Sequence, residues 1–218
     1  MAGGALFLAI TTVQGIIRDG FDPWQQAMSA LSLGPGGWVQ MINLIGLGVV
    51  MLSTVPTWRR ILAGGTGHTA YPVLTAIVGA SFVVVGMVRQ DPAPGYDPAG
   101  LALTSPTPLG LVHLAVAGVA ALASVASLAV MAVRFRGDPA WRRWSVWSWV
   151  AAFAVVGCVV VYGIWSVRSH GYAGTFERAA VAVPLVWMFA LLRRLSAGTP
   201  FMLSEQTTLL RTSSGTRR

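Results

Sequence analysis

Residues 109–133 read LGLVHLAVAGVAALASVASLAVMAV, and His113 is the only side chain in this run that can carry a charge. As an α-helix rising about 1.5 Å per residue, the run is about 38 Å long, more than the roughly 30 Å hydrocarbon core of a bilayer. Inside that core the backbone groups must be hydrogen-bonded within the chain, and a helix meets this requirement by itself. The run therefore predicts a transmembrane helix.

Five further apolar segments flank this run, at about residues 2–17, 38–55, 70–88, 146–167 and 177–195. The chain is 55% hydrophobic and 10% charged, whereas soluble domains carry about 25% charged residues. Its apolar surface therefore needs lipid to cover it. We expect an all-α fold, a polytopic transmembrane bundle of about six helices, in one domain over residues 1–195. Residues 196–218 are rich in Ser, Thr and Arg, which predicts a disordered cytoplasmic tail.

The arginines predict how the chain is oriented in the membrane. Lysine is absent, and abundant Ala, Gly and Val suggest a GC-rich bacterial genome. Four of the arginines, Arg18, Arg89, Arg168 and Arg178, fall in the first, third and fifth loops, and the others fall in the remaining loops and the tail. Basic residues accumulate in cytoplasmic loops, so we expect a multi-pass inner-membrane protein with both termini in the cytoplasm. The loop RFRGDPAWRR (134–143) is expected to rest on anionic lipid.

Aromatic and small residues give two packing predictions. Tryptophans favour the membrane–water interface, so interface positions are predicted for Trp58, Trp141 and Trp144 on one side and for Trp24, Trp38 and Trp165 on the other. Small side chains let helices approach closely. Helix packing is therefore the interpretation of Ala117, Ala121, Ser124 and Ser127, which recur at helical spacing in residues 109–133.

The loops predicted to lie outside the cytoplasm resemble one another. They read IRDGFDP (17–23), VRQDPAPGYDP (88–98) and VRSHGY (167–172), each with Arg followed by Gly and an aromatic residue. One hypothesis is that the bundle consists of three related helical hairpins. The other is that these residues are common at helix ends near a membrane surface. Residues 23–33 are predicted to form a short amphipathic helix, with Asp22 as its N-cap.

Several of these motifs, taken in order, resemble a bacterial membrane family called domain of unknown function 998. They are RDGFDP (18–23), SALSLGPGGWVQ (29–40), DPAPGYDP (91–98), LVHL (111–114) and GTFER (174–178). The resemblance covers about residues 5–195 and implies a small multi-helix inner-membrane protein. It implies no activity, substrate or catalytic residue. The chain departs from the family pattern at Glu177, where Gln is expected, and in a first segment that is shorter than expected.

Two classes of function remain open, besides a purely structural or partner-binding role. The first is binding or transport of a lipid or small amphiphile through an outward-facing polar site. For this function the candidate ligand-binding residues are Arg18, Asp22, Arg89, Arg178, Gln40 and Asn43. The second is an intramembrane enzyme acting on a lipid or isoprenoid substrate by acid–base chemistry. Its candidate catalytic residues are Asp91, Asp97, His113 and Glu177.

Other functions are not indicated. The arginines lie between apolar segments rather than on one soluble face, so we expect no nucleic-acid partner. The sequence holds none of the common catalytic or phosphate-binding motifs, and we expect neither a metal nor a cofactor. His113 has a simpler interpretation as a histidine hydrogen-bonded at a helix end. The expected partners are membrane lipids, and the oligomeric state is left open.

Overall fold

The computed structural model describes residues 2–92, 95–98, 100, 101, 103–168 and 171–197. The described residues form the α-helices α1 (Ala2–Ile17), α2 (Gly37–Ile61), α3 (Ala70–Met87), α4 (Pro108–Arg136), α5 (Arg142–Trp165) and α6 (Ala173–Ser196). Two short 3₁₀ helices join them, η1 (Met28–Ser32) and η2 (Pro139–Trp141). The predicted all-α bundle is confirmed. Nearly all of the predicted tail lies outside the described residues.

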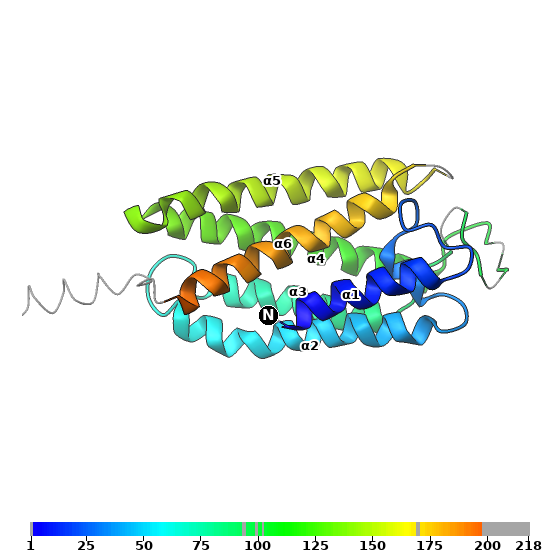
Figure 1. Ribbon diagram of the computed structural model, residues 1–218, viewed down its shortest axis with the longest axis horizontal. Coiled ribbons are helices and arrows are strands. Elements are labelled where there is room, and N and C mark those ends of the chain that lie inside the picture. The colour runs from blue at the N-terminus through cyan, green and yellow to red at the C-terminus, as the bar shows by residue number, and fades with distance from the viewer. Residues whose placement is uncertain (1, 93–94, 99, 102, 169–170, 198–218) are drawn as a thin grey trace, which may run out of the picture.

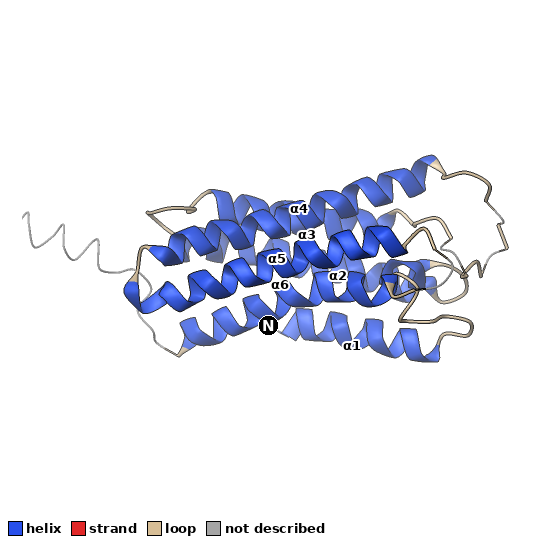
Figure 2. Cartoon of the chain, turned by 90° about the horizontal axis from the view of Figure 1, so that it is seen from above, coloured by secondary structure: helices blue, strands red, loops and turns tan. Residues whose placement is uncertain are grey.

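Five of the helices, α2 to α6, are long and apolar enough to cross a membrane, whereas α1 has 16 residues. Each helix packs against the next one in the chain, and the long helices run side by side along the bundle (Figures 1 and 2). Helix α1 covers only the half of the bundle that lies near η1, and its first residue lies midway along α2 (Figure 1). We call this half the η1 end, and the opposite half the aromatic end.

Helices α2 and α3 pack through glycine. A methyl group added at Gly48 would lie 2.5 Å from the carbonyl oxygen of Gly79, and one added at Gly79 would lie 2.9 Å from that of Gly48. About two turns further along α3, a methyl group added at Gly86 would lie 2.9 Å from the carbonyl oxygen of Met41. Without side chains at these points the two backbones touch, which is how helices associate closely in lipid.

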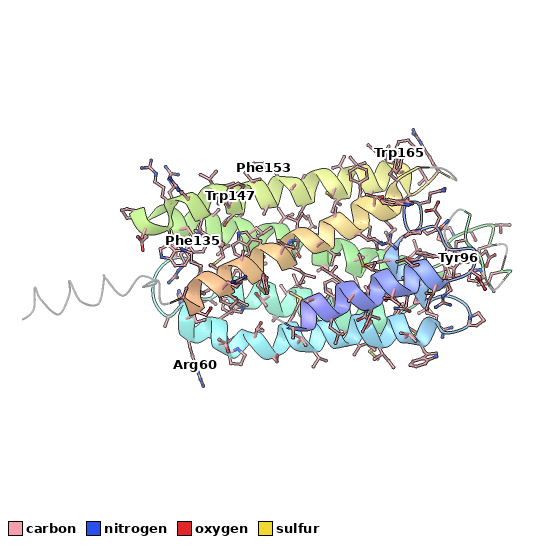
Figure 3. The ribbon with its side chains drawn as sticks, in the orientation of Figure 1. Arg60, Tyr96, Phe135, Trp147, Phe153 and Trp165 are labelled. Carbon is pink, nitrogen blue, oxygen red and sulfur yellow. The ribbon has the colours of Figure 1, made fainter. Side chains whose placement is uncertain are left out.

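The aromatic end is a closely packed core. Phe135 stacks on Trp141 with 5.1 Å between ring centroids, and Trp58 meets Tyr71 edge-on at 5.0 Å. The indole N–H of Trp187 donates to the hydroxyl of Ser148 at 3.1 Å. Trp58 and Trp141 are fully buried, so they pack inside the bundle, and their predicted place near the membrane interface stays a prediction. Residues that do point outward from α5 include Trp147 and Phe153 (Figure 3).

Arg134 closes the aromatic end. Its side chain is buried and donates to the carbonyl oxygens of Leu62, Gly64 and Thr66, at 3.3, 3.0 and 2.9 Å. These carbonyl groups belong to the loop after α2, so the guanidinium supplies hydrogen bonds that the loop backbone does not make itself. The expectation that Arg134 rests on lipid is therefore wrong.

Residues 18–36 link α1 to α2 and form the η1 loop, which covers the η1 end. Only Met28–Ser32 are helical, so the prediction of an amphipathic helix over residues 23–33 is wrong. Asp22 does cap the backbone, but at a turn, because its carboxylate accepts a hydrogen bond from Trp24 N at 2.8 Å. Ala27, Met28 and Leu31 are buried, so the loop presses its apolar residues onto the bundle.

Candidate functional site

A cavity of about 740 Å³ occupies the bundle between η1 and the aromatic end. All the long helices contribute to its lining, together with η1 and the segment after α3. Its apolar part includes Leu44, Met51, Val78, Phe82 and Met188. Its polar part lies toward η1 and includes Ser29, Gln90, Asp91, His113, Tyr162 and Glu177. The volume falls within the range of about 300–1,000 Å³ typical of sites for small ligands.

The small residues of α4 line this cavity. Ala117, Ala121, Ser124 and Ser127 all face it, so the prediction that they serve helix packing is wrong. Their short side chains leave the space empty where larger residues on the same face would fill it. The hydroxyl of Ser127 is occupied within the helix, since it donates to the backbone carbonyl oxygen of Ser124 at 2.8 Å.

The cavity opens sideways between α4 and α5. Gly118 of α4 and Gly163 of α5 both line it, and a methyl group added to either would meet no atom within 4 Å. Leu114 is 60% exposed and Val159 is 36% exposed, although both also line the cavity. Helices α4 and α5 lie together at the aromatic end and separate toward the η1 end (Figure 1). The opening therefore faces the surroundings of the bundle, at the level of its long helices.

Glu177 of α6 lies at the polar end of the cavity and holds the η1 loop. Its carboxylate accepts hydrogen bonds from the backbone N–H of Met28 and from the hydroxyl of Ser29. The same hydroxyl lies in hydrogen-bond contact with the side-chain amide of Gln90. The hydroxyl faces Oε1 of Gln90, which accepts, and a hydroxyl has one hydrogen, so Ser29 shares that hydrogen between Gln90 and Glu177.

The first turn of α6 is docked on the η1 loop. The N–H groups of Gly174 and Thr175 donate to the carbonyl oxygens of Gln25 and Trp24, at 3.0 and 3.1 Å. The first N–H groups of a helix have no partner within the helix, and here the loop supplies a carbonyl oxygen for each of these two groups. A methyl group at Gly174 would lie 2.2 Å from the carbonyl oxygen of Gln26. The motif GTFER (174–178) is thus the docking surface of the loop.

His113 lines the cavity from the first turns of α4. Its Nδ1 lies 2.5 Å from the carbonyl oxygen of Val88. A carbonyl oxygen only accepts, so Nδ1 carries the hydrogen and the neutral ring has its lone pair on Nε2. Nε2 has no hydrogen-bond partner within the described part of the chain. The interpretation of His113 as a histidine hydrogen-bonded at a helix end is correct for one ring nitrogen, and the other is an acceptor.

Asp91 joins the segment after α3 to the start of α4. Its carboxylate accepts from the backbone N–H of Thr107 at 2.8 Å and from the Thr107 hydroxyl at 2.6 Å. Thr107 in turn caps α4 by accepting from Gly110 N at 3.0 Å. Asp91, His113 and Glu177 therefore meet in one cavity, whereas Asp97, an exposed residue between α3 and α4, lines neither this cavity nor the groove described next.

The arginines predicted to bind a ligand contact the protein itself. Arg178 donates to the carbonyl oxygens of Pro23, Gln26 and Gly174. Arg18 donates in the same way to those of Leu31, Leu33 and Pro35. Arg89 contacts the sulfur of Met41 at 3.4 Å. Arg178 also interacts electrostatically with Glu177 and with Asp22, so charges of α6 and of the η1 loop lie close together here.

A second hollow, a groove of about 690 Å³, lies along α1 near Arg18 and Tyr96. Tyr96 packs edge-on against Phe21 at 5.2 Å, and its burial raises the pKa of the phenol, an effect that the charge of Arg18 opposes. The groove is mostly apolar and lies at the η1 end, where Figure 3 shows Tyr96. Its lining shares no residue with that of the cavity.

Gln40 and Asn43 belong to a buried network between α1 and α2. Gln14 donates to Gln40 Oε1 at 2.9 Å, and Asn43 donates to the hydroxyl of Thr11 and to the carbonyl oxygen of Phe7, both at 3.1 Å. These amides fasten the short α1 to α2, and they do not line the cavity.

Sequence reasoning missed Ser29, Gln90 and Tyr162, which share the polar end of the cavity with Glu177. Ser29 and Gln90 lie within two of the motifs quoted above, next to residues that were singled out. Tyr162 lies in an apolar helix, where its hydroxyl is the only signal.

The family described as "Protein of unknown function (DUF998)" matches residues 1–194 of the chain. Comparison with curated proteins and with solved structures gave no match.

Proposed function

The chain belongs to this DUF998 family, which brings no activity with it, and we propose on the geometry of the cavity that it binds a lipid or small amphiphile. The observation that carries the proposal is a cavity with an apolar part, a polar part and a sideways opening between α4 and α5. An amphiphile has the same two parts. The alkyl chain of the amphiphile enters between the helices, and its polar head lies beside Glu177 and His113.

Binding is favoured over conduction because the aromatic end is filled. The stacked rings of Phe135 and Trp141 and the buried Trp58 lie where a path through the bundle would continue. A cavity open at one side and filled at one end suits a molecule that enters and leaves by the same route. We also propose, from the arginine distribution, that the η1 end faces away from the cytoplasm, in the inner membrane of a bacterium.

Native mass spectrometry of the purified protein in a neutral detergent tests the binding. The probes are three amphiphiles with the same twelve-carbon chain: dodecanol, dodecylamine and dodecanoic acid. We expect a one-to-one adduct with at least one of them, and loss of that adduct in Gly163→Phe, which fills the opening. The matched control is Gly157→Phe, on the same helix and also in open space but outside the cavity lining. Equal binding by all three proteins, or no adduct at all, would contradict the proposal.

A second candidate function is acid–base catalysis on such a ligand. It is favoured by the fixed tautomer of His113, whose Nε2 lone pair is free to take a proton. Glu177 faces the same space. The test is to incubate the protein with a bacterial lipid extract and to search for new products by mass spectrometry. In this case His113→Gln keeps ligand binding and abolishes conversion. No product from the wild-type protein would leave binding as the function.

A further inference from the structure

We infer that the ligand's head is a cation that donates hydrogen bonds, such as a primary ammonium, and that Glu177 is its counter-ion. The inference rests on the proposed function, because it assigns the chemistry of the head that the cavity holds. It departs from the choice of Arg18, Arg89 and Arg178 as candidate ligand-binding residues, since arginines suit an anionic head.

The first support is the balance of acceptors and donors at the polar end. Glu177 is a carboxylate to which the N–H of Met28 and both the N–H and the hydroxyl of Ser29 donate. A carboxylate has about four acceptor positions, so capacity remains on the side that faces the cavity. His113 adds the lone pair of Nε2. A ligand therefore has to supply hydrogens to this end of the cavity.

The second support is the position of the arginines. Arg178, next to Glu177, donates through Nη1 to the backbone carbonyl oxygens of Pro23, Gln26 and Gly174. Its Nη2 is buried without a hydrogen-bond partner in the described part of the chain, but it lies beside Gly15 of α1, and Arg178 does not line the cavity. Arg168 lines the rim of the cavity, but its side chain is exposed and its guanidinium lies 4.9 Å from the ring centroid of Trp165. Among the described residues that line the cavity, the buried ones include no cation. An anionic head would therefore lie beside the carboxylate of Glu177 with no buried positive charge to bind it.

The third support is the charge of Glu177 at the edge of an apolar space, where the nearby Arg178 interacts with it but donates its hydrogen bonds to backbone carbonyl oxygens. A carboxylate in an apolar enclosure is stabilised by hydrogen bonds and, more strongly, by an opposite charge. Glu177 keeps its hydrogen bonds to the η1 loop and faces a space whose far side is apolar, including Phe82 and Met188. An alkylammonium ligand would place a positive charge beside Glu177 and its apolar chain in the apolar part of the cavity. A carboxylate or phosphate head would instead place two negative charges together, which is unfavourable.

The same three amphiphiles decide the inference. At pH 7.5 we expect dodecylamine to bind at least about tenfold more tightly than dodecanoic acid, a difference of about 1.4 kcal/mol. Glu177→Gln keeps the shape but removes the charge and exchanges one of the two acceptor oxygens for an NH2 group. It should therefore lower amine binding about tenfold and lower dodecanol binding less, because dodecanol forms no ion pair with the carboxylate. Asp138→Asn is the control, since it removes a carboxylate at the aromatic end, where Asp138 caps Ala140 N at 2.9 Å.

The outcomes separate the inference from the proposed function. If no amphiphile binds, or if Gly163→Phe binds them all as the wild type does, the cavity is not a binding site and both proposals fall. If dodecanoic acid binds as tightly as dodecylamine, or if Glu177→Gln binds the amine unchanged, the cationic head is overturned while binding stands. If Glu177→Gln does not fold, the comparison of the amine with the acid on the wild-type protein decides alone.

Discussion

The carboxylate of Asp91 rests directly on the backbone of Gly110, so that a methyl group at position 110 would lie 2.1 Å from Oδ2 of Asp91. Asp91 is held there by two hydrogen bonds from Thr107. This contact joins the segment after α3 to the first turn of α4, one turn before His113.

Gly110→Ala is therefore expected to displace Asp91 and to lower stability by about 1–3 kcal/mol, because a short side chain held by two hydrogen bonds has little room to move. Thermal unfolding in detergent measures the change. Gly118→Ala is the matched control, since it lies on the same helix in open space. A Gly110→Ala protein as stable as the control would show that Asp91 is not fixed in this place.

A second prediction concerns the contact between α2 and α3. Gly48→Ala places a methyl group 2.5 Å from the carbonyl oxygen of Gly79 and 2.8 Å from the backbone nitrogen of Val83. Backbone atoms cannot yield as a side chain can, so we expect the helices to separate at a cost of about 1–3 kcal/mol. Gly46→Ala, in the same helix with nothing within 4 Å, should be neutral or slightly stabilising. Equal unfolding temperatures would contradict the close contact.

The buried side chain of Arg134 gives a third prediction. Arg134→Met removes the donor for the carbonyl oxygens of Leu62, Gly64 and Thr66. Leaving the buried carbonyl oxygen of Leu62 and the partly buried ones of Gly64 and Thr66 without their donor should lower stability by about 1–3 kcal/mol. Arg136→Met removes the same charge from an exposed position two residues away, and it should change stability little. If both variants unfold alike, the hydrogen bonds to the loop do not stabilise the fold.

The fourth prediction is the orientation of the bundle. Reporter fusions at residues 64 and 138 should show cytoplasmic activity, and fusions at residues 100 and 172 should show activity on the other side, because the arginines concentrate in the second and fourth loops and the tail. Activity outside the cytoplasm at residue 64 or 138 would overturn the arrangement. It would leave the binding proposal intact, since the cavity does not depend on sidedness.

The helices were predictable because length and hydropathy decide them locally. Residues 109–133 lie within α4, Pro108–Arg136, and residues 70–88 coincide with α3, Ala70–Met87, to within one residue. The pattern did not extend to α6, where the prediction of 177–195 missed the first turn from Ala173. That turn is stabilised by hydrogen bonds to the η1 loop, which lies far away in sequence.

The environment of single residues was less predictable, because it depends on which helices meet. Trp58 and Trp141 stand near charged residues, as interface tryptophans do, and only the arrangement of α2, α4 and α5 buries them. Ala117 and Ala121 have the spacing of a packing surface, but the helix that would pack there, α5, diverges. Asp91, His113 and Glu177 were chosen for their chemistry, and the fold brings them to one cavity.

Phe135 stacks on Trp141 just before the start of α5. A small rotation of α5 about this contact would be amplified at the far end of the helix. From this pivot α5 runs through 24 residues to Trp165, a length of about 36 Å. A rotation of about 5° at the pivot would move the far tip by about 3 Å at that length, enough to widen or narrow the gap beside α4 for an alkyl chain. A change in how these two aromatic rings lie on each other would therefore alter which molecules can enter at the opposite end of the protein.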